Sequence, residues 1–230
     1  GEVRTAKVSS TGTAPEAAVL DGIRGIMAEA GVAGRQVVEV LHGTTIGSNT
    51  PLERTRAPTG LITTRGFRDI LEIGRVRTPE MFDLAWTKPE PLVPRRARLE
   101  VTERIAADGS VVTPLAEAEV LEAGRRLQRQ GITSVAVCFI NSYRNAAHER
   151  RVGELLARHF PGFEVTLSAA LQPEAKEYER ASTAVVNAYV LPVMRGYLAR
   201  LAAGLEALGI AAPLLVVSSS GGLVRAAVAQ

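Results

Sequence analysis

The stretch SVAVCFINSYRNAAHERRVGELLARHFPGFEVTL, residues 134–167, decides the predicted fold class. Residues 135–140 are a continuous apolar run, which is typical of a strand buried on both faces of a mainly parallel sheet. Residues 145–160 have the apolar spacing of an amphipathic helix, and Pro161-Gly162 separates this helix from a second strand candidate at 163–167. Strands that alternate with helices predict an α/β protein.

The same alternation continues on both sides of this stretch. Thr13 and Glu16 have the spacing of a capping box, ahead of a helix that ends at Gly31. Asp108-Gly109 predicts the turn of an antiparallel hairpin. The other expected elements are strands at 2–8, 37–41, 60–63, 99–105 and 214–217, a long excursion at 74–98, and helices at 113–130 and 174–208, the second interrupted at Pro192. Together they predict a mixed sheet with antiparallel hairpins at one edge.

The composition is that of a globular protein and argues against several classes of function. The 230 residues carry a formal net charge of +3, and only 4% of them are aromatic. Few aromatics argue against a stacking platform for nucleic acid; the basic cluster at 94–98 is either a solvated turn or an anion-binding patch. One cysteine and three histidines without ligand spacing predict no metal site. No membrane span and no signal peptide are recognisable, so we expect a cytoplasmic protein.

The run LHGTTIGSNTPLER, residues 41–54, is the first of three candidate sites. It follows a strand candidate, and ligand sites in α/β sheets lie at the carboxyl ends of strands. His42 can act as a hydrogen-bond donor or a proton carrier near neutral pH. Further donors for an anion come from the residues Gly43, Thr44, Thr45, Gly47, Ser48 and Asn49. The alternative is a polar loop whose side chains bond its own backbone. The run lacks the Gly-Lys-Ser/Thr ending of a P-loop.

The second candidate site is a polar stripe on the helix expected at 173–190. Its members are Glu177, Arg180, Thr183 and Asn187. A polar stripe on a mostly apolar helix must face water, a partner or a cleft. Thr and Asn are poor helix formers, so a merely solvated face would favour other residue types. A solvated face and a functional face both stay open.

The third candidate site is VVSSSGGLVRAA, residues 216–227, in which a strand candidate ends in serines and glycines. We expect a helix to start after the glycines, so that backbone donors and the positive helix N-terminus can meet an anion there. A tight turn with an N-cap explains the pattern equally well, and the run is not a GxSxG nucleophile elbow. No carboxylate pair is recognisable at the strand ends to hold Mg²⁺ or to act as a general base.

Six ordered blocks of the sequence resemble one protein family. The blocks are HGTTIGSNTPLER, GLITTRGFRDILEIGR, KPEPLVPRRARLEVTERI, AVCFINSYRNAAHERRVGELL, EYERASTAVVNAYVLPVMRGYL and VVSSSGGL. In this order they are similar to the N-terminal half of the hydantoinase A / 5-oxoprolinase family. That family includes ATP-hydrolysing N-methylhydantoinase A subunits and the acetone and acetophenone carboxylase subunits.

The resemblance implies an actin-like, ribonuclease-H-type ATPase fold with the start of a second lobe. Residues 1–168 would be the N-terminal domain without its first strand, and residues 169–230 a helical connection and the start of the hydantoinase A domain. The implied activity is ATP-dependent hydrolysis of cyclic amides of the hydantoin or 5-oxoproline type. The alternative is a nucleotide-binding subunit of an ATP-dependent ketone carboxylase complex. The family also implies ATP and Mg as cofactors, a hydantoinase B-type partner subunit or domain, and an oligomer. In this family the principal nucleotide-binding residues lie outside the part that this chain resembles. We therefore expect the isolated chain to be inactive.

Within this resemblance, the candidate residues take three expected roles. The catalytic group comprises His42, Thr44, Thr45 and Asn49. The cofactor-binding group comprises Gly43, Gly47, Thr63, Thr64, Ser219, Ser220, Gly221 and Gly222. The group expected to contact the substrate or to lie between the lobes comprises Glu177, Arg180, Thr183 and Asn187.

Overall fold

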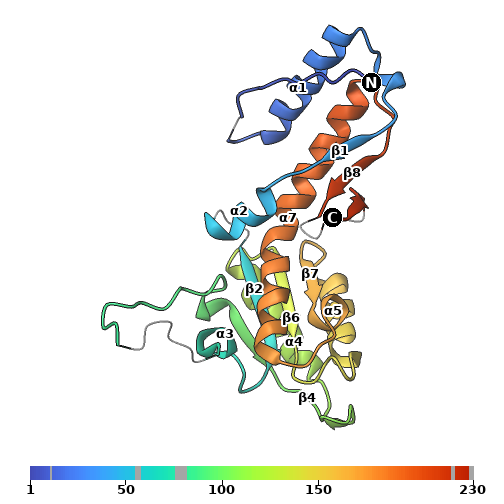
Figure 1. Ribbon diagram of the computed structural model, residues 1–230. Coiled ribbons are helices and arrows are strands. Elements are labelled where there is room, and N and C mark those ends of the chain that lie inside the picture. Colours follow the sequence, from blue (N-terminus) through green and yellow to red (C-terminus); the bar gives the residue numbers. More distant parts are fainter. Residues whose placement is uncertain (11, 55–57, 76–81, 219–220, 228–230) are drawn as a thin grey trace. The chain divides into compact units, whose positions relative to one another are not determined.

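The computed structural model in Figure 1 describes residues 1–10, 12–54, 58–75, 82–218 and 221–227. The chain divides into two units, which are described separately. Unit 1 comprises Gly1–Asn49 and Val193–Gln230, and unit 2 comprises Thr50–Pro192. Each unit has its own sheet and its own hydrophobic core.

Four parallel strands in the order β3-β2-β6-β7 form the main sheet of unit 2. Their bounds are β2 Thr59–Thr64, β3 Arg98–Val101, β6 Ser134–Cys138 and β7 Glu164–Leu167. The central strands β2 and β6 pair in register from Thr59↔Ser134 to Thr63↔Cys138. Every residue of these two strands is buried, which confirms the prediction from the apolar run at 135–140. The alternation of these parallel strands with helices confirms the predicted α/β class.

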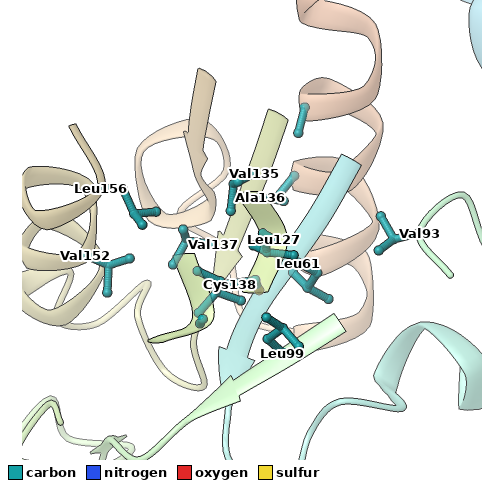
Figure 2. Packing of buried hydrophobic residues seen from close by; sticks show 14 of the residues in the cluster. Leu61, Val93, Leu99, Leu127, Val135, Ala136, Val137, Cys138, Val152 and Leu156 are labelled. Atoms are coloured by element: carbon teal, nitrogen blue, oxygen red, sulfur yellow. The ribbon is translucent and has the colours of Figure 1, made fainter. Parts of the chain in front are cut away.

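The helices of unit 2 pack their apolar faces against this sheet. Their bounds are α3 Ile70–Ile73, α4 Glu117–Arg129, α5 Ala147–His159, α6 Ser168–Leu171 and the first part of α7 Glu177–Ala207, with a 3-10 turn at Arg95–Ala97. Figure 2 shows Leu127 of α4 and Leu156 of α5 beside the strand residues Leu61 and Val137, and all four side chains are fully buried. Burying one such side chain contributes about 1.5–3 kcal/mol, so the predicted amphipathic helices hold the sheet by their apolar faces.

The predicted hairpin is confirmed as β4 Arg104–Ile105 paired antiparallel with β5 Val111–Thr113. Its turn is made by Asp108, whose carboxylate accepts a bond from the Ser110 N–H at 2.9 Å, and by Gly109 at a φ of 91°. The single strand expected at 99–105 is instead divided between β3 and β4. Residues 82–94 contain no helix or strand, as expected for the excursion, and residues 76–81 lie outside the described part of the chain.

Unit 1 is built on a three-stranded sheet in the order β1-β8-β9. Its elements are α1 Pro15–Ala30, a 3-10 turn at Gly34–Gln36, β1 Val40–His42, β8 Leu214–Val217, β9 Leu223–Arg225 and the later part of α7; the short helix α2 Ile46–Leu52 begins in it. The core is formed by Leu198, Leu201 and Leu205 of α7 with Val216 of β8. Leucines from the later part of α7 thus share one core with a strand of this small sheet.

Three local predictions in unit 1 are wrong. Residues 2–8 form no strand, because a strand requires a hydrogen-bonded neighbour and this segment has none within the described residues. Thr13 does not cap α1; the N-cap residue is Ala14, and the Glu16 carboxylate instead binds Arg200 at 2.6 Å. The run after Gly222 forms strand β9 and not a helix, since it turns back and pairs antiparallel with β8.

Helix α7 continues through Pro192, where we expected an interruption. Proline has no N–H and cannot donate to the carbonyl of Ala188, four residues earlier. The hydroxyl of Ser134 donates to that carbonyl at 2.6 Å instead, and Ser134 is fully buried. A strand side chain thereby replaces the missing helix bond. Among the described residues, no helix has the length and hydropathy needed to cross a membrane.

We expect Ser134→Ala to lower the free energy of unfolding by about 1–3 kcal/mol, because the Ala188 carbonyl then has neither partner. In a Pro192→Ala background the restored N–H can donate to this carbonyl, so the same substitution should cost less. Urea unfolding of the two single variants and the double variant measures this coupling. Equal costs of Ser134→Ala in both backgrounds would contradict the proposed replacement.

Candidate functional site

The carboxyl ends of two parallel strands bring together two of the three predicted sites. β1 pairs with β8 from Val40↔Leu214 to His42↔Val216. Residues 42–49 therefore leave the sheet beside the residues that follow β8. We use the name β1/β8 edge for residues 42–49 together with residues 218, 221 and 222. Ligands of α/β proteins bind at such carboxyl ends, which makes this edge the candidate site.

The polar run at 42–49 is partly bonded to itself. The Ile46 N–H donates to the Thr44 hydroxyl at 3.2 Å, where α2 begins. The Asn49 N–H and the Ser48 hydroxyl both donate to the Thr45 carbonyl, at 2.8 and 2.9 Å. The bonds of the Thr44 and Ser48 side chains to the backbone are those that the loop alternative predicts. Thr45, Ser48 and Asn49 are nevertheless exposed, so the same residues can also contact a ligand.

The turn after β8 presents backbone groups at the same edge. The Ser218 N–H donates to the Gly222 carbonyl at 2.8 Å, and the Gly221 N–H donates to the Ser218 carbonyl at 2.9 Å. Gly221 has a φ of 83°, a conformation that glycine adopts without strain. Gly221 and Gly222 are exposed; Ser219 and Ser220, also predicted here, lie outside the described residues. Because β9 follows, the turn has no helix N-terminus to attract an anion.

A buried hydrogen-bonded group supports His42 from within unit 1. His42 Nε2 lies 2.8 Å from the hydroxyl of Tyr197 on α7. Burial lowers the pKa of His42 below its usual range. Burial first, and then the charge of Glu16, raise the pKa of Tyr197, while a hydrogen bond with Thr44 opposes this increase. Both groups are therefore neutral at pH 7. Tyr197 was not among the predicted site residues, because it lies far along the chain from His42 and no local pattern links the two.

Thr63 and Thr64, predicted to bind the cofactor, are buried at the end of β2 in unit 2. The Thr63 hydroxyl donates to the Cys138 carbonyl at 2.8 Å. The Thr64 hydroxyl donates to the Glu103 carboxylate and accepts from the Ile140 N–H at 3.0 Å. Both hydroxyls thus already tie neighbouring segments of unit 2 together.

The predicted polar stripe on α7 does not have one environment. Arg180 is buried and donates to the carbonyls of Phe139 and Glu174, at 2.5 and 2.8 Å. Asn187 donates to the Thr166 hydroxyl at 3.1 Å. Of the other two members of the stripe, Glu177 is half-buried and Thr183 is exposed. Two of the four residues therefore fasten α7 to the sheet of unit 2.

Two buried carboxylates of unit 2, Glu149 and Glu103, lie near its strand ends, and each is bound to partners of its own. Glu149 is fully buried and accepts bonds from the Phe139 N–H, the Ser168 hydroxyl and the Ala169 N–H. Glu103, which follows β3, lies 2.8 Å from Nδ1 of His148. Neither contact was visible in the sequence, because the partners come from separate elements. Among the described residues, no group of three or more His, Cys, Asp or Glu side chains can hold a metal ion.

Unit 2 contains two other features that could serve as a functional site, the Cys138 thiol and a pocket. Burial raises the pKa of the Cys138 thiol to about 11, so it is not an ionised nucleophile at neutral pH. A pocket of about 670 Å³ lies between α3, residues 86–92 and α7, with Trp86 and Tyr178 in its lining. Its described lining contains none of the predicted site residues. The strand-end geometry therefore favours the β1/β8 edge.

The sheets of this chain define an α/β protein of the actin-like ATPase type. The model of the hydantoinase/oxoprolinase N-terminal region matches residues 1–160, and the hydantoinase/oxoprolinase model matches residues 180–230. The chain belongs to the hydantoinase/oxoprolinase family, as its six blocks predicted.

The relatives include subunits of two enzymes. Caprolactamase subunit alpha from Pseudomonas jessenii is 34% identical over 232 residues, which cover 97% of this chain and 33% of that subunit. The gamma subunit of acetophenone carboxylase from Aromatoleum aromaticum is 34% identical, over 80% of this chain and 27% of that subunit. The crystal structure of ATP-dependent caprolactamase from Pseudomonas jessenii matches with a TM-score of 0.91 and 33% identity, over 98% of this chain and 34% of that one. The chain thus spans about a third of the length of these relatives or less.

Proposed function

We propose that this chain is the N-terminal part of an ATP-dependent hydrolase of cyclic amides, and that the β1/β8 edge binds its phosphate or amide substrate. The observation that carries the proposal is the pairing of β1 with β8, which places two donor-rich segments at one sheet edge. The similarity to an ATP-dependent caprolactamase supports it, because caprolactam is a cyclic amide.

The residues of this edge suit an oxyanion better than a metal ion. Gly43, Gly221 and Gly222 are exposed, so a phosphate oxygen can approach their backbone closely. Thr45 and Asn49 add exposed side-chain donors, whereas the described residues offer no acidic cluster for Mg²⁺. ATP would supply the phosphoryl group that activates the amide carbonyl. The role of this chain is to bind and orient the anionic group by hydrogen bonds.

The remaining expectations stay predictions of the same proposal. They include the cofactor roles of Thr63 and Thr64, the substrate or interlobe role of Glu177, Arg180, Thr183 and Asn187, the domain division after residue 168, the hydantoinase B-type partner and the cytoplasmic location. The names of the relatives as subunits support a partner subunit in general.

The second candidate function is a nucleotide-binding subunit of a ketone carboxylase. The 34% identity to an acetophenone carboxylase gamma subunit favours it. Turnover of ATP by the complete protein separates the two functions. Turnover that depends on hydantoin, 5-oxoproline or caprolactam supports the hydrolase, and turnover that depends on acetone or acetophenone with bicarbonate supports the carboxylase.

We expect His42→Ala, Thr45→Ala and Asn49→Ala each to lower substrate-dependent ATP turnover of the complete protein. Loss of one donor to a developing oxyanion lowers kcat by about 100-fold or more. The melting temperature should fall by only a few degrees, because these residues lie at the surface or half-buried. Thr133→Ala removes an exposed hydroxyl from unit 2 and is the matched control. Unchanged kinetics in all three variants, or their unfolding, would overturn the proposed site.

A further inference from the structure

We infer that Tyr197 is a positioning residue that holds the His42 ring with its proton on Nδ1, so that His42 presents an N–H donor and not a base to the ligand. The inference rests on the proposed function, since it specifies how one residue of the β1/β8 edge acts. Nothing in the similarity to known relatives assigns a role to Tyr197.

The geometry fixes which nitrogen of His42 is engaged. The Tyr197 hydroxyl lies 2.8 Å from Nε2, and the two ring centroids are 5.6 Å apart with a 39° tilt. Within the described residues, Nδ1 has no recorded hydrogen-bond partner. Nε2 is therefore directed at the helix side chain, and Nδ1 is the nitrogen left for a ligand.

The charge states of the pair follow from its surroundings. Burial lowers the pKa of His42, and burial together with Glu16 raises the pKa of Tyr197. Glu16 on α1 is the charged group that acts on Tyr197, and its carboxylate pairs with Arg200 of α7 at 2.6 Å. A neutral imidazole and a neutral phenol are thus in contact at pH 7, and a neutral imidazole carries one proton on one nitrogen.

The buried phenol decides where that proton is. Tyr197 is only 2% exposed, so leaving its O–H without an acceptor would be costly. The Thr44 oxygen already accepts the Ile46 N–H, and its own hydroxyl can donate to the phenol oxygen. Tyr197 then donates to Nε2, which must be the unprotonated nitrogen. The chain of donors runs from Thr44 through Tyr197 to His42 and leaves the proton on Nδ1.

The consequence is a specific chemical role for His42. An Nδ1–H group can donate to a phosphate oxygen or to a carbonyl oxygen that gains negative charge, but it cannot accept a proton at that atom. The phosphate oxygen and the carbonyl oxygen are both hydrogen-bond acceptors. A His42 ring that can only donate at Nδ1 therefore favours an oxyanion as the ligand. The base of the reaction would have to be another group.

The tautomer can be observed directly in the complete protein labelled with ¹⁵N-histidine. Long-range ¹H–¹⁵N correlation spectra at pH 7 should show the Nδ1–H form for His42, assigned by loss of its signals in His42→Asn. Tyr197→Phe removes only the hydroxyl and should produce a mixture of tautomers, while Tyr189→Phe, at another buried tyrosine of α7, should leave the spectrum unchanged. An Nε2–H form in the parent protein, or no effect of Tyr197→Phe, would overturn the inference.

Kinetics of two substitutions at His42 provide the second test. The amide nitrogen of asparagine can occupy the place of Nδ1, whereas that of glutamine reaches toward the place of Nε2. We expect His42→Asn to retain at least about ten-fold more kcat/KM than His42→Gln, a difference of about 1.4 kcal/mol, and Tyr197→Phe to lose about ten-fold. Equal loss in both His42 variants would contradict a donor role. If His42→Ala retains full activity while the Nδ1–H form is observed, the proposed function fails and the positioning of the ring stands.

Discussion

Glu149→Ala is expected to lower the free energy of unfolding by about 3–5 kcal/mol, the largest effect that we predict for unit 2. The carboxylate is fully buried and accepts three hydrogen bonds, including one at 2.6 Å from Ser168. Ser168 in turn accepts from the buried guanidinium of Arg180 at 3.2 Å. Removal of the carboxylate takes this acceptor away from the buried Phe139 N–H, the buried Ser168 hydroxyl and the partly buried Ala169 N–H.

The matched control is Glu154→Ala on the same helix. The Glu154 side chain is 65% exposed and pairs with Arg151 at 3.0 Å, and an exposed ion pair contributes about 0–1 kcal/mol. Equilibrium urea unfolding followed by circular dichroism compares the two variants. Similar midpoints for Glu149→Ala and Glu154→Ala would show that the buried network does not stabilise unit 2.

Gly34→Ala is expected to destabilise unit 1 by about 3 kcal/mol or more, because the new methyl group meets backbone and not a movable side chain. A Cβ atom at this position would lie 2.6 Å from the carbonyl carbon of Gly209 and 2.7 Å from its oxygen, and closer still to the Leu208 carbonyl oxygen. The turn that follows α7 would have to move away from Gly34.

Gly25→Ala, also in unit 1, is expected to have the opposite effect on stability and serves as the control. Gly25 lies inside α1, and nothing lies within 4 Å of a Cβ atom placed there. Since alanine is the better helix former, this substitution should stabilise α1 by about 0.5–1 kcal/mol. Thermal melts of both variants test the pair. A Gly34→Ala protein as stable as the parent would contradict the close backbone approach.

The features predicted correctly from the sequence are those whose signal is local. The apolar run at 135–140, the helix that follows it and the Asp108-Gly109 turn each carry their own periodicity or turn chemistry, and all three are present. The helix predicted after Gly222 is wrong, because serine and glycine precede a returning strand as readily as a helix. Only the pairing of β9 with β8 decides between them.

The candidate site was predictable in its residues but not in its assembly. The polar run at 42–49 and the turn at 218–222 stand out in the sequence, but their proximity depends on pairing between strands that lie far apart in it. The contacts of His42 with Tyr197 and of Glu149 with Ser168 depend in the same way on tertiary packing. The sequence left open whether Arg180 and Asn187 face solvent or a partner, and in the structure both bind residues within unit 2.

The pairing of β1 with β8 also sets an order of events during synthesis. All of unit 2 lies between these two strands in the sequence, so Val40 cannot meet Leu214 until unit 2 has left the ribosome. Contacts of high sequence separation form slowly, and chain segments made first tend to fold first. The sheet that holds the β1/β8 edge is therefore the last of the two sheets to close, and the candidate site is completed only after unit 2 has folded.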